Sequence, residues 1–333
     1  MHKNELTYLT KKLNDCNSKL IIYGFNNIGY CIYQIFKDKV VDIVDRVKQG
    51  EIIDRISIKS IEDCEYNPND IFVIASVNNN ANKEIRKSII SKFGDKTKIY
   101  SINDYYFDEN EDMARYCPIC KTHSNYFKPF GINPRKDVQC PACGSLERHR
   151  LSWLVIEEKL KNINLRNKNL LHIAPEQIFK EKFAELFKEN YVTADISGKG
   201  VYMQMDITDI KLPDNSFDYI YCSHVFEHII DDREAMRELH RVLKSDGWAI
   251  LLVPIVLKKS HTEEDFSIIS KEDRLKHYGH PEHVRNYGSD YIDRLIESGW
   301  KVEVIYPEGF LTHKEIEFMG ITKAAGEIYF CTK

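Results

Sequence analysis

Four cysteines stand in two pairs with the spacing of a metal site. Cys117-Pro-Ile-Cys120 and Cys140-Pro-Ala-Cys143 are two Cys-x2-Cys motifs with nineteen residues between them. Two such pairs supply four thiolates, which is the tetrahedral ligand set of a structural zinc ribbon. Because four sulfur ligands leave no open coordination position, we expect a Zn2+ ion here to organise the fold and to take no part in chemistry.

Histidine, glutamate and arginine residues gather in two stretches of the C-terminal half, where they could bind a substrate or accept a proton. An imidazole is the natural base near neutral pH, and a guanidinium can hold a substrate oxygen or phosphate. We predict His283 as the general base, His280 as the second choice and Arg285 as the anchor. The alternative is that these residues only hydrogen-bond their own loop. The two stretches hold His224, Glu227 and His228, and His280, His283 and Arg285.

The segment 151–333, which carries both stretches, has an alternating pattern of strands and helices. Short apolar runs are separated by helical periodicity, which predicts a mostly parallel sheet. Ligands of such sheets bind at the carboxyl ends of the strands, so residues just beyond those ends are candidates for a site. The predicted strands are Asn169–Ile173, Tyr191–Ala194, Phe217–Cys222, Trp248–Val253, Lys301–Tyr306 and Glu327–Thr332.

The segment 1–108 predicts a smaller Rossmann-like α/β domain. A strand at Lys19–Tyr23 enters the turn Gly24–Gly29, and a second strand at Val40–Val44 continues the alternation with helices. In a dinucleotide-binding turn, the middle glycine lets the backbone approach a pyrophosphate, and Asn26 stands in that place here. Nucleotide binding and a purely structural role both stay open for this domain.

Length and charge set the outer limits of the interpretation. We divide the 333 residues into the first α/β domain at 1–108, the zinc ribbon at 109–150 and the second α/β domain at 151–333. The formal charge of −4 gives no overall basic field for binding nucleic acid, although 113–150 holds seven Lys or Arg against two acidic residues.

No signal peptide or long apolar run is apparent, so we expect a cytoplasmic protein that does not enter the membrane. Homo-oligomerisation stays open.

Two phrases of the second α/β domain resemble the signature of the class I S-adenosylmethionine-dependent methyltransferases. The phrase from Asp206 to Ile229 reads DITDIKLPDNSFDYIYCSHVFEHI, and that from Glu238 to Ile250 reads ELHRVLKSDGWAI. The resemblance covers roughly 151–333. It implies a Rossmann-like, mostly parallel seven-stranded sheet, S-adenosyl-L-methionine as cosubstrate and methyltransferase activity (EC 2.1.1.-). A narrower group of bacterial methyltransferases, some associated with surface-polysaccharide assembly, is similar in its Cys-Pro-x-Cys-Gly-Ser-x-Glu-Arg-His-Arg ribbon before a His-Ile-Ala-Pro-Glu turn.

Carried over by position, the resemblance implies a set of cofactor-binding residues. Asp195, at the end of the second strand, would accept hydrogen bonds from both ribose hydroxyls. Asp206 would receive the adenine amino group, and Ile207 would supply an apolar surface against the base. Ser223 and His224 follow the predicted strand Phe217–Cys222 and would touch the cofactor.

The turn after the first strand departs from the family pattern. His172-Ile173-Ala174-Pro175-Glu176 replaces an acidic residue followed by a glycine-rich turn. We interpret this turn as a variant cofactor cradle and include His172, Ala174 and Glu176 among the cofactor-binding residues. Ala174 is small enough for close approach, and Glu176 could pair with the amino group of the methionine moiety.

Together these features predict an enzyme that methylates a hydroxyl or amine of a small polar acceptor, with a sugar or nucleotide-linked sugar as the leading candidate. Two alternatives stay open. One is an RNA methyltransferase that holds its substrate with the basic zinc ribbon, which the overall acidity disfavours. The other is a non-catalytic scaffold protein that only binds S-adenosylmethionine or a nucleotide.

Overall fold

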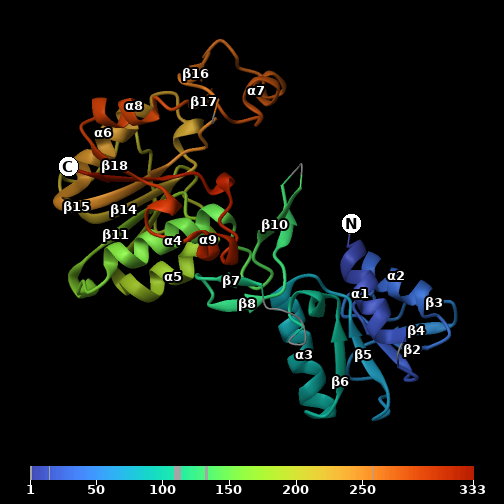
Figure 1. Cartoon of the computed structure of the whole chain (residues 1–333). Helices are drawn as coiled ribbons and strands as arrows, with labels where there is room; N and C mark the ends of the chain where they lie inside the picture. The colour runs from blue at the N-terminus through green and yellow to red at the C-terminus, as the bar shows by residue number, and fades with distance from the viewer. Residues whose placement is uncertain (1, 15, 109–113, 132–133, 257) are drawn as a thin grey trace. The chain divides into compact units, whose positions relative to one another are not determined.

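The chain forms two compact units, Met1–Gly144 and Ser145–Lys333, each with its own sheet (Figure 1). The computed structural model describes residues 2–14, 16–108, 114–131, 134–256 and 258–333. The predicted start of the zinc ribbon, at residue 109, lies outside these residues. In the described part of the chain, no helix has both the length and the apolar character that a membrane span requires.

The first unit is built on a six-stranded sheet with the order β3-β4-β2-β1-β5-β6. All neighbours are parallel except β3 and β4, which form an antiparallel pair. The sheet is that of the predicted Rossmann-like α/β domain. Its elements are α1 (Lys3–Asn14), β1 (Leu20–Tyr23), α2 (Asn27–Ile35), β2 (Val40–Val44), β3 (Ile52–Ile53), β4 (Ile56–Lys59), β5 (Ile71–Ile74), α3 (Asn79–Phe93) and β6 (Lys98–Ser101).

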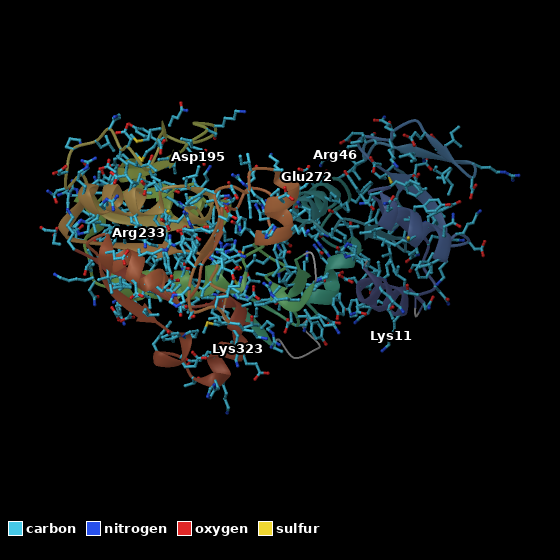
Figure 2. The ribbon with its side chains drawn as sticks, turned by 90° about the horizontal axis from the view of Figure 1, so that it is seen from above. Lys11, Arg46, Asp195, Arg233, Glu272 and Lys323 are labelled. Carbon is cyan, nitrogen blue, oxygen red and sulfur yellow. The ribbon has the colours of Figure 1, made fainter. Side chains whose placement is uncertain are left out.

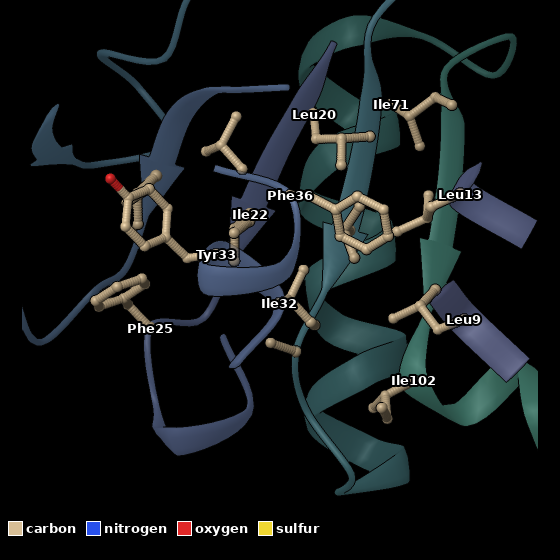
Figure 3. Close-up of a cluster of buried hydrophobic side chains, with 14 of the residues drawn as sticks. Leu9, Leu13, Leu20, Ile22, Phe25, Ile32, Tyr33, Phe36, Ile71 and Ile102 are labelled. Carbon is tan, nitrogen blue, oxygen red and sulfur yellow. The ribbon is translucent and has the colours of Figure 1, made fainter. Parts of the chain in front are cut away.

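Apolar side chains cover both faces of this sheet, as a parallel sheet requires. On one face, Leu20 and Ile22 of β1 pack with Leu9 of α1 and Ile32 of α2 (Figure 3). On the other face, Ile21 packs in a second cluster that includes Ile89 of α3. Because successive residues of a strand point to opposite sides, the fully apolar run of β1 supplies both clusters.

The paired cysteines belong to two antiparallel hairpins of the first unit. The pair β7 (Arg115–Cys117) and β8 (Thr122–Ser124) carries the first Cys-x2-Cys motif in its turn. The pair β9 (Lys128–Phe130) and β10 (Arg135–Gln139) leads directly into the second motif. The hairpins therefore bring together cysteines that are far apart in the sequence.

The second unit is built on a seven-stranded sheet with the order β13-β12-β11-β14-β15-β19-β18. The strands from β13 to β15 are parallel, and β19 is antiparallel to both of its neighbours. This confirms the predicted α/β class with a mostly parallel seven-stranded sheet. The strands are β11 (Leu170–Ile173), β12 (Tyr191–Asp195), β13 (Met203–Gln204), β14 (Phe217–Ser223), β15 (Leu243–Leu252), β18 (Lys301–Ile305) and β19 (Ile328–Thr332).

Helices cover both faces of the second sheet, with α4 and α5 on one side and α6 and α8 on the other (Figure 1). Helix α5 shows why: Phe179, Phe183 and Phe187 recur every four residues and form one buried stripe. Phe179 packs edge-on against Tyr221 of β14, with 5.0 Å between ring centroids. The helices are α4 (Glu147–Leu160), α5 (Gln177–Phe187), α6 (Asp232–Val242), α7 (Lys271–Tyr278), α8 (Tyr291–Glu297) and α9 (His313–Phe318).

The long connection after β15 has more structure than its sequence predicts. It contains α7 and a two-residue antiparallel pair, β16 (Glu263–Glu264) and β17 (Arg285–Asn286). The strand prediction also missed β13, which is only two residues long. Elements this short have no periodicity to detect, because tertiary contacts and not local pattern define them.

Candidate functional site

A cavity of about 610 Å³ opens at the carboxyl ends of β11 and β12 in the second unit. Its wall combines aliphatic and acidic side chains. The strand ends contribute Ile173, Ala174 and Asp195, and the next connection contributes Asp206 and Ile207. A concave, mostly apolar space with a few polar groups at strand ends is the usual form of a small-molecule site in an open α/β sheet.

The turn at the end of β11 has a constrained backbone. Ala174 has φ 44°, in the left-handed region that side chains other than glycine rarely adopt. Its amide donates to Ala194 O of the neighbouring strand at 2.8 Å, which fixes the turn against β12. His224, one residue beyond β14, also has a positive φ of 56°. Two such residues at neighbouring strand ends mark this edge of the sheet as a site worth testing.

Two predicted carboxylates lie on the cavity wall. Asp195, labelled in Figure 2, accepts the Ser197 amide at Oδ1 with a distance of 2.7 Å. Asp206 accepts the Thr208 amide at 2.9 Å and its hydroxyl at 2.7 Å, and these hydrogen bonds lower the pKa of the Asp206 carboxyl. Ile207 lies beside Asp206 on the wall and is almost fully buried. The structure thus brings Asp195, Asp206 and Ile207 together with Ala174.

Three other predicted cofactor residues lie elsewhere. His172 is fully buried, packs against Phe183 of α5 and has its Nδ1 2.8 Å from Tyr191 Oη of β12; burial lowers its pKa to about 3 and keeps it neutral. The imidazole is therefore a core group and not a ligand contact. Ser223 is buried at the last position of β14. His224 points to Glu227, with 3.3 Å between Nδ1 and Oε1.

Glu176 caps the cradle turn with its carboxylate held inside the protein. Oε1 receives Arg148 Nη2 at 3.0 Å and lies 2.8 Å from His149 Nε2. Burial alone would raise the pKa of Glu176, but the hydrogen bonds and charges of His149 and Arg148 lower it to about 2. Within the described residues, Oε2 has no hydrogen-bond partner. One oxygen is thus held by the protein, while the second is buried, and Glu176 is not among the residues that line the cavity.

The histidines of the long connection meet beside the cavity. His283 and His280 have ring centroids 4.5 Å apart, and His283 lies 4.8 Å from His228, which is on the cavity wall. Burial, followed by the neighbouring imidazoles, lowers the pKa of His283 to about 4, although Glu227 opposes this. The structure therefore joins the two histidine stretches that the sequence separates.

Arg285 does not fit the predicted role of substrate anchor. The side chain is 1% exposed, and Nε donates to Glu264 at 2.8 Å. Nη1 and Nη2 donate to the carbonyls of Phe226 and Ile230, each at 2.8 Å. Through these contacts the guanidinium joins β17 to the segment after β14. Its nitrogen atoms are therefore already bonded to protein groups and do not face a substrate.

The segment after β14 supplies wall residues that sequence reasoning missed. His228 was named from the sequence, whereas the missed residues are Val225, Ile229, Ile230, Asp231 and Glu234. The strand-end rule points to this connection but gives no means of choosing among its side chains, because their direction depends on the tertiary fold.

The four predicted zinc ligands come together in the first unit. Their sulfur atoms all lie within 4.8 Å of one another. Cys117 Sγ and Cys143 Sγ are 3.7 Å apart, as are Cys120 Sγ and Cys140 Sγ. A tetrahedron with Zn–S bonds of about 2.3 Å places its sulfur atoms roughly 3.8 Å apart. The cluster therefore fits Zn2+ in both donor chemistry and size.

The Gly24–Gly29 turn of the first unit is closed by its own side chains. Asn26 Oδ1 accepts the amides of Ile28 and Gly29, which are the donors at the start of α2 that a phosphate would use. Asp45, in the position of a ribose-binding carboxylate, accepts the Phe25 amide at 2.7 Å. A Cβ on Gly29 would lie 2.1 Å from Gly24 O, so close packing alone explains why this position requires glycine. These contacts favour the structural alternative over nucleotide binding.

Known proteins match the second unit. The sequence model of the family described as "Methyltransferase domain" matches residues 171–251. An uncharacterized methyltransferase of Bacillus subtilis, YcgJ, is 33% identical over 84 residues, which cover 25% of this chain and 31% of that protein. The match thus spans about a third of the relative's length.

Solved structures of S-adenosylmethionine-dependent methyltransferases are also similar to this chain. One from Mesorhizobium loti has a TM-score of 0.39 and 15% identity over 55% of this chain and 97% of its own. One from Archaeoglobus fulgidus has a TM-score of 0.33 and 16% identity over 56% of this chain and 92% of its own.

The sheet order, the antiparallel β19 and the strand-end cavity define the class I methyltransferase fold. Residues 171–251, which match the sequence model of a methyltransferase domain, lie within the unit Ser145–Lys333 that carries this sheet.

We predict that Cys143→Ser abolishes zinc binding, because three thiolates and a hydroxyl no longer complete the tetrahedral set. Wild-type protein should retain one zinc per chain after dialysis, measured by plasma mass spectrometry, and the variant should retain less than about a tenth of that. Cys31→Ser is the matched control, since Cys31 is exposed and outside the cluster. Equal zinc in both variants would refute the site.

We predict that Glu176→Gln destabilises the protein above pH 4.5 and that this difference disappears towards pH 2. The pKa of Glu176 is lowered in the folded state, so its ionised form stabilises the fold above the unfolded pKa. The expected loss at neutral pH is on the order of 3 kcal/mol. Urea unfolding at several pH values measures it.

The control for this experiment is Glu185→Gln, which changes an exposed carboxylate of α5. A difference between Glu176→Gln and wild type that does not change with pH would show that the ion pairs of Glu176 do not stabilise the domain.

Proposed function

We propose that this chain is an enzyme that transfers the methyl group of S-adenosylmethionine to a hydroxyl or amine of a small polar acceptor. The observation that carries the proposal is the strand-end cavity, with Asp195 and Asp206 on the wall of a methyltransferase domain. S-Adenosylmethionine supplies a methyl group already activated by its sulfonium. The protein then has to bind the two substrates in line and exclude water.

The wall residues suggest how the cofactor binds. In this proposal Asp195, on the cavity wall, accepts both ribose hydroxyls, and Asp206, on the same wall, accepts the adenine amino group. Ile207 supplies an apolar surface to the base. In this proposal Glu176 is the candidate partner for the ammonium of the methionine moiety, which requires its second oxygen, buried in this structure, to become accessible to the ligand. Arg148, which forms an ion pair with Glu176, carries a positive charge that would attract the carboxylate of the methionine moiety.

The acceptor would enter from the side of the histidines. A hydroxyl acceptor has to lose its proton as the new bond forms, and we propose His283 for this step, with His280 as the second candidate. Both lie next to His228 on the cavity wall. Polar groups at the rim of a largely apolar cavity suit a sugar or a nucleotide-linked sugar.

An RNA acceptor is the second candidate, and one observation favours it. Residues 113–150 hold seven Lys or Arg against two acidic residues. Binding to bulk RNA that falls steeply with salt would support RNA, because each neutralised phosphate releases a counterion. No binding at low salt would leave the small-molecule acceptor.

We predict that Asp195→Ala weakens S-adenosylmethionine binding at least about tenfold, since a hydrogen bond to a charged group is worth about 1.5–3 kcal/mol. Calorimetry on the zinc-loaded full chain measures it. Asp246→Ala is the control, because Asp246 is an exposed carboxylate whose ion pair with Lys168 spans 3.6 Å. Its affinity should equal that of the wild type.

Two results would contradict the proposal in different ways. If Asp195→Ala binds as tightly as wild type, the cofactor lies elsewhere. If the folded wild-type protein gives neither heat nor thermal stabilisation with S-adenosylmethionine and S-adenosylhomocysteine, the protein is a scaffold and not an enzyme. Transfer of labelled methyl groups to a panel of sugars and nucleotide sugars then tests the acceptor class.

A further inference from the structure

Three imidazoles from two separate segments converge at the rim of the cavity. His228 ends the short helix η4 (Phe226–His228), and His280 and His283 lie between α7 and β17. The ring centroids are 4.5 Å apart for His280 and His283, 4.8 Å for His228 and His283, and 5.6 Å for His228 and His280. One ring nitrogen of each lies within 4.8 Å of the others. Three nitrogens at about 2.1 Å from a tetrahedral ion are roughly 3.4 Å apart, so small side-chain rotations would close the set.

The backbone that carries the three imidazoles is fixed by contacts of its own. The Val284 amide donates to Glu227 O at 2.8 Å, which joins the two segments next to their histidines. Buried Arg285 donates to the carbonyls of Phe226 and Ile230 on either side of His228. Helix α7 ends at Gly279, whose positive φ of 75° turns the chain into His280. The backbone that carries the imidazoles is therefore held in place before any ligand binds, and only side-chain rotations are needed to close the set.

The hydrogen bonds of His228 prepare it as a ligand. Its Nδ1 lies 3.2 Å from Glu282 O, and a carbonyl can only accept, so Nδ1 carries the proton and Nε2 carries the lone pair. Metal-binding histidines usually donate their other N–H to such an acceptor. His280 receives the Glu282 amide at Nδ1 over 3.2 Å. That contact is long and exposed, so an ion could replace it at little cost.

A buried carboxyl group adjoins His228 in the sequence. Glu227 precedes His228 and is 1% exposed, and its Oε1 lies 3.3 Å from His224. Its Oε2 has no hydrogen-bond partner in the part of the chain that the structure describes. An unpaired buried carboxylate oxygen is costly in a neutral surrounding and is offset by a cation nearby.

We propose that His228, His280 and His283 bind one divalent transition-metal ion of the Zn2+ or Ni2+ type. Imidazole nitrogens favour these ions over Mg2+ and Ca2+, which prefer oxygen ligands. Three protein ligands leave a coordination position open, unlike the closed set of four cysteines. Because His228 lies on the cavity wall, an ion bound here would lie beside the cavity.

The site deepens the proposed function, and its catalytic consequence rests on that function. An acceptor hydroxyl bound at the open position is more acidic, so it loses its proton to water and keeps its electron pair on oxygen. The oxygen forms the new bond to the methyl carbon, and the carbon–sulfur bond breaks with its pair going to sulfur. In the metal-bound enzyme, His283 is then a ligand that positions the ion, and proton removal no longer depends on its lone pair.

The test uses the untagged full chain whose cysteine site already holds one zinc per chain. Calorimetric titration with Ni2+ should give one further equivalent. His280→Gln and His283→Gln should each weaken that second binding at least about tenfold, because each removes one of three ligands. The first zinc should stay in place in both variants, and thermal unfolding like that of the wild type should show that their second unit is folded. His261→Gln is the control, since His261 is exposed and outside the cluster.

A second readout identifies the ligands of the added ion. Co2+ in place of Ni2+ should give absorption bands without the thiolate charge-transfer feature that cysteine ligation would add. No second equivalent in the wild type would overturn the site, as would equal binding by the two His→Gln variants and the control.

Metal binding and S-adenosylmethionine binding are measured separately, so failure of one leaves the other standing. A second metal without cofactor binding would refute the proposed function and keep the metal site. Cofactor binding without a second metal would do the reverse, and His283 would remain the candidate base.

Discussion

Complete burial of the central strands dictates where this protein can do chemistry. Every residue of β11 and β14 is buried, because helices cover both faces of the sheet. Polar groups inside such a sheet can only serve packing, as the neutral His172 illustrates. Ligand contacts must therefore come from the connections that leave the strand ends. Ala174 of the turn after β11, Asp195 at the end of β12, Asp206 and His228 all lie at that one edge.

The long connection after β15 depends on a second constraint, which is a buried ionic network. Asp232 accepts Tyr287 Oη at 2.6 Å and Arg294 Nη1 at 3.0 Å, and Glu264 receives Arg285 and Arg294. These pairs tie the connection to α6 and α8. Removing one partner would leave a buried charge uncompensated, which is why such a network holds one arrangement firmly. The positions of His280 and His283 follow from it.

Sequence alone predicted most of the fold and part of the site. The strand ranges and the cysteine cluster were predictable, because burial periodicity and ligand spacing are local properties. Asp195 and Asp206 reached the cavity wall because they follow strand ends that the resemblance identifies. Which face of β11 carries His172 was not predictable, since an apolar run is buried on both sides. The partners of Glu176 and Arg285 were not predictable either, as they lie 27 and 59 residues away in contacts such as His149 and Phe226.

The two units also show that similar sheets can carry different turns after their first strands. In the first unit, Asn26 and Asp45 satisfy the turn's own amides, whereas the corresponding turn of the second unit leads into an open cavity. The difference lies in which side chains follow the first strand, and not in the order of the strands.

The left-handed alanine of the cradle turn has a consequence for the speed of binding. A glycine-rich turn is flexible in the free protein and has to become ordered when its ligand arrives. The Ala174 amide already donates a hydrogen bond to the neighbouring strand. The next residue is Pro175, whose ring fixes its φ. The turn therefore keeps its shape without a ligand. Association should then be limited by diffusion and access to the cavity, and not by rearrangement of the backbone.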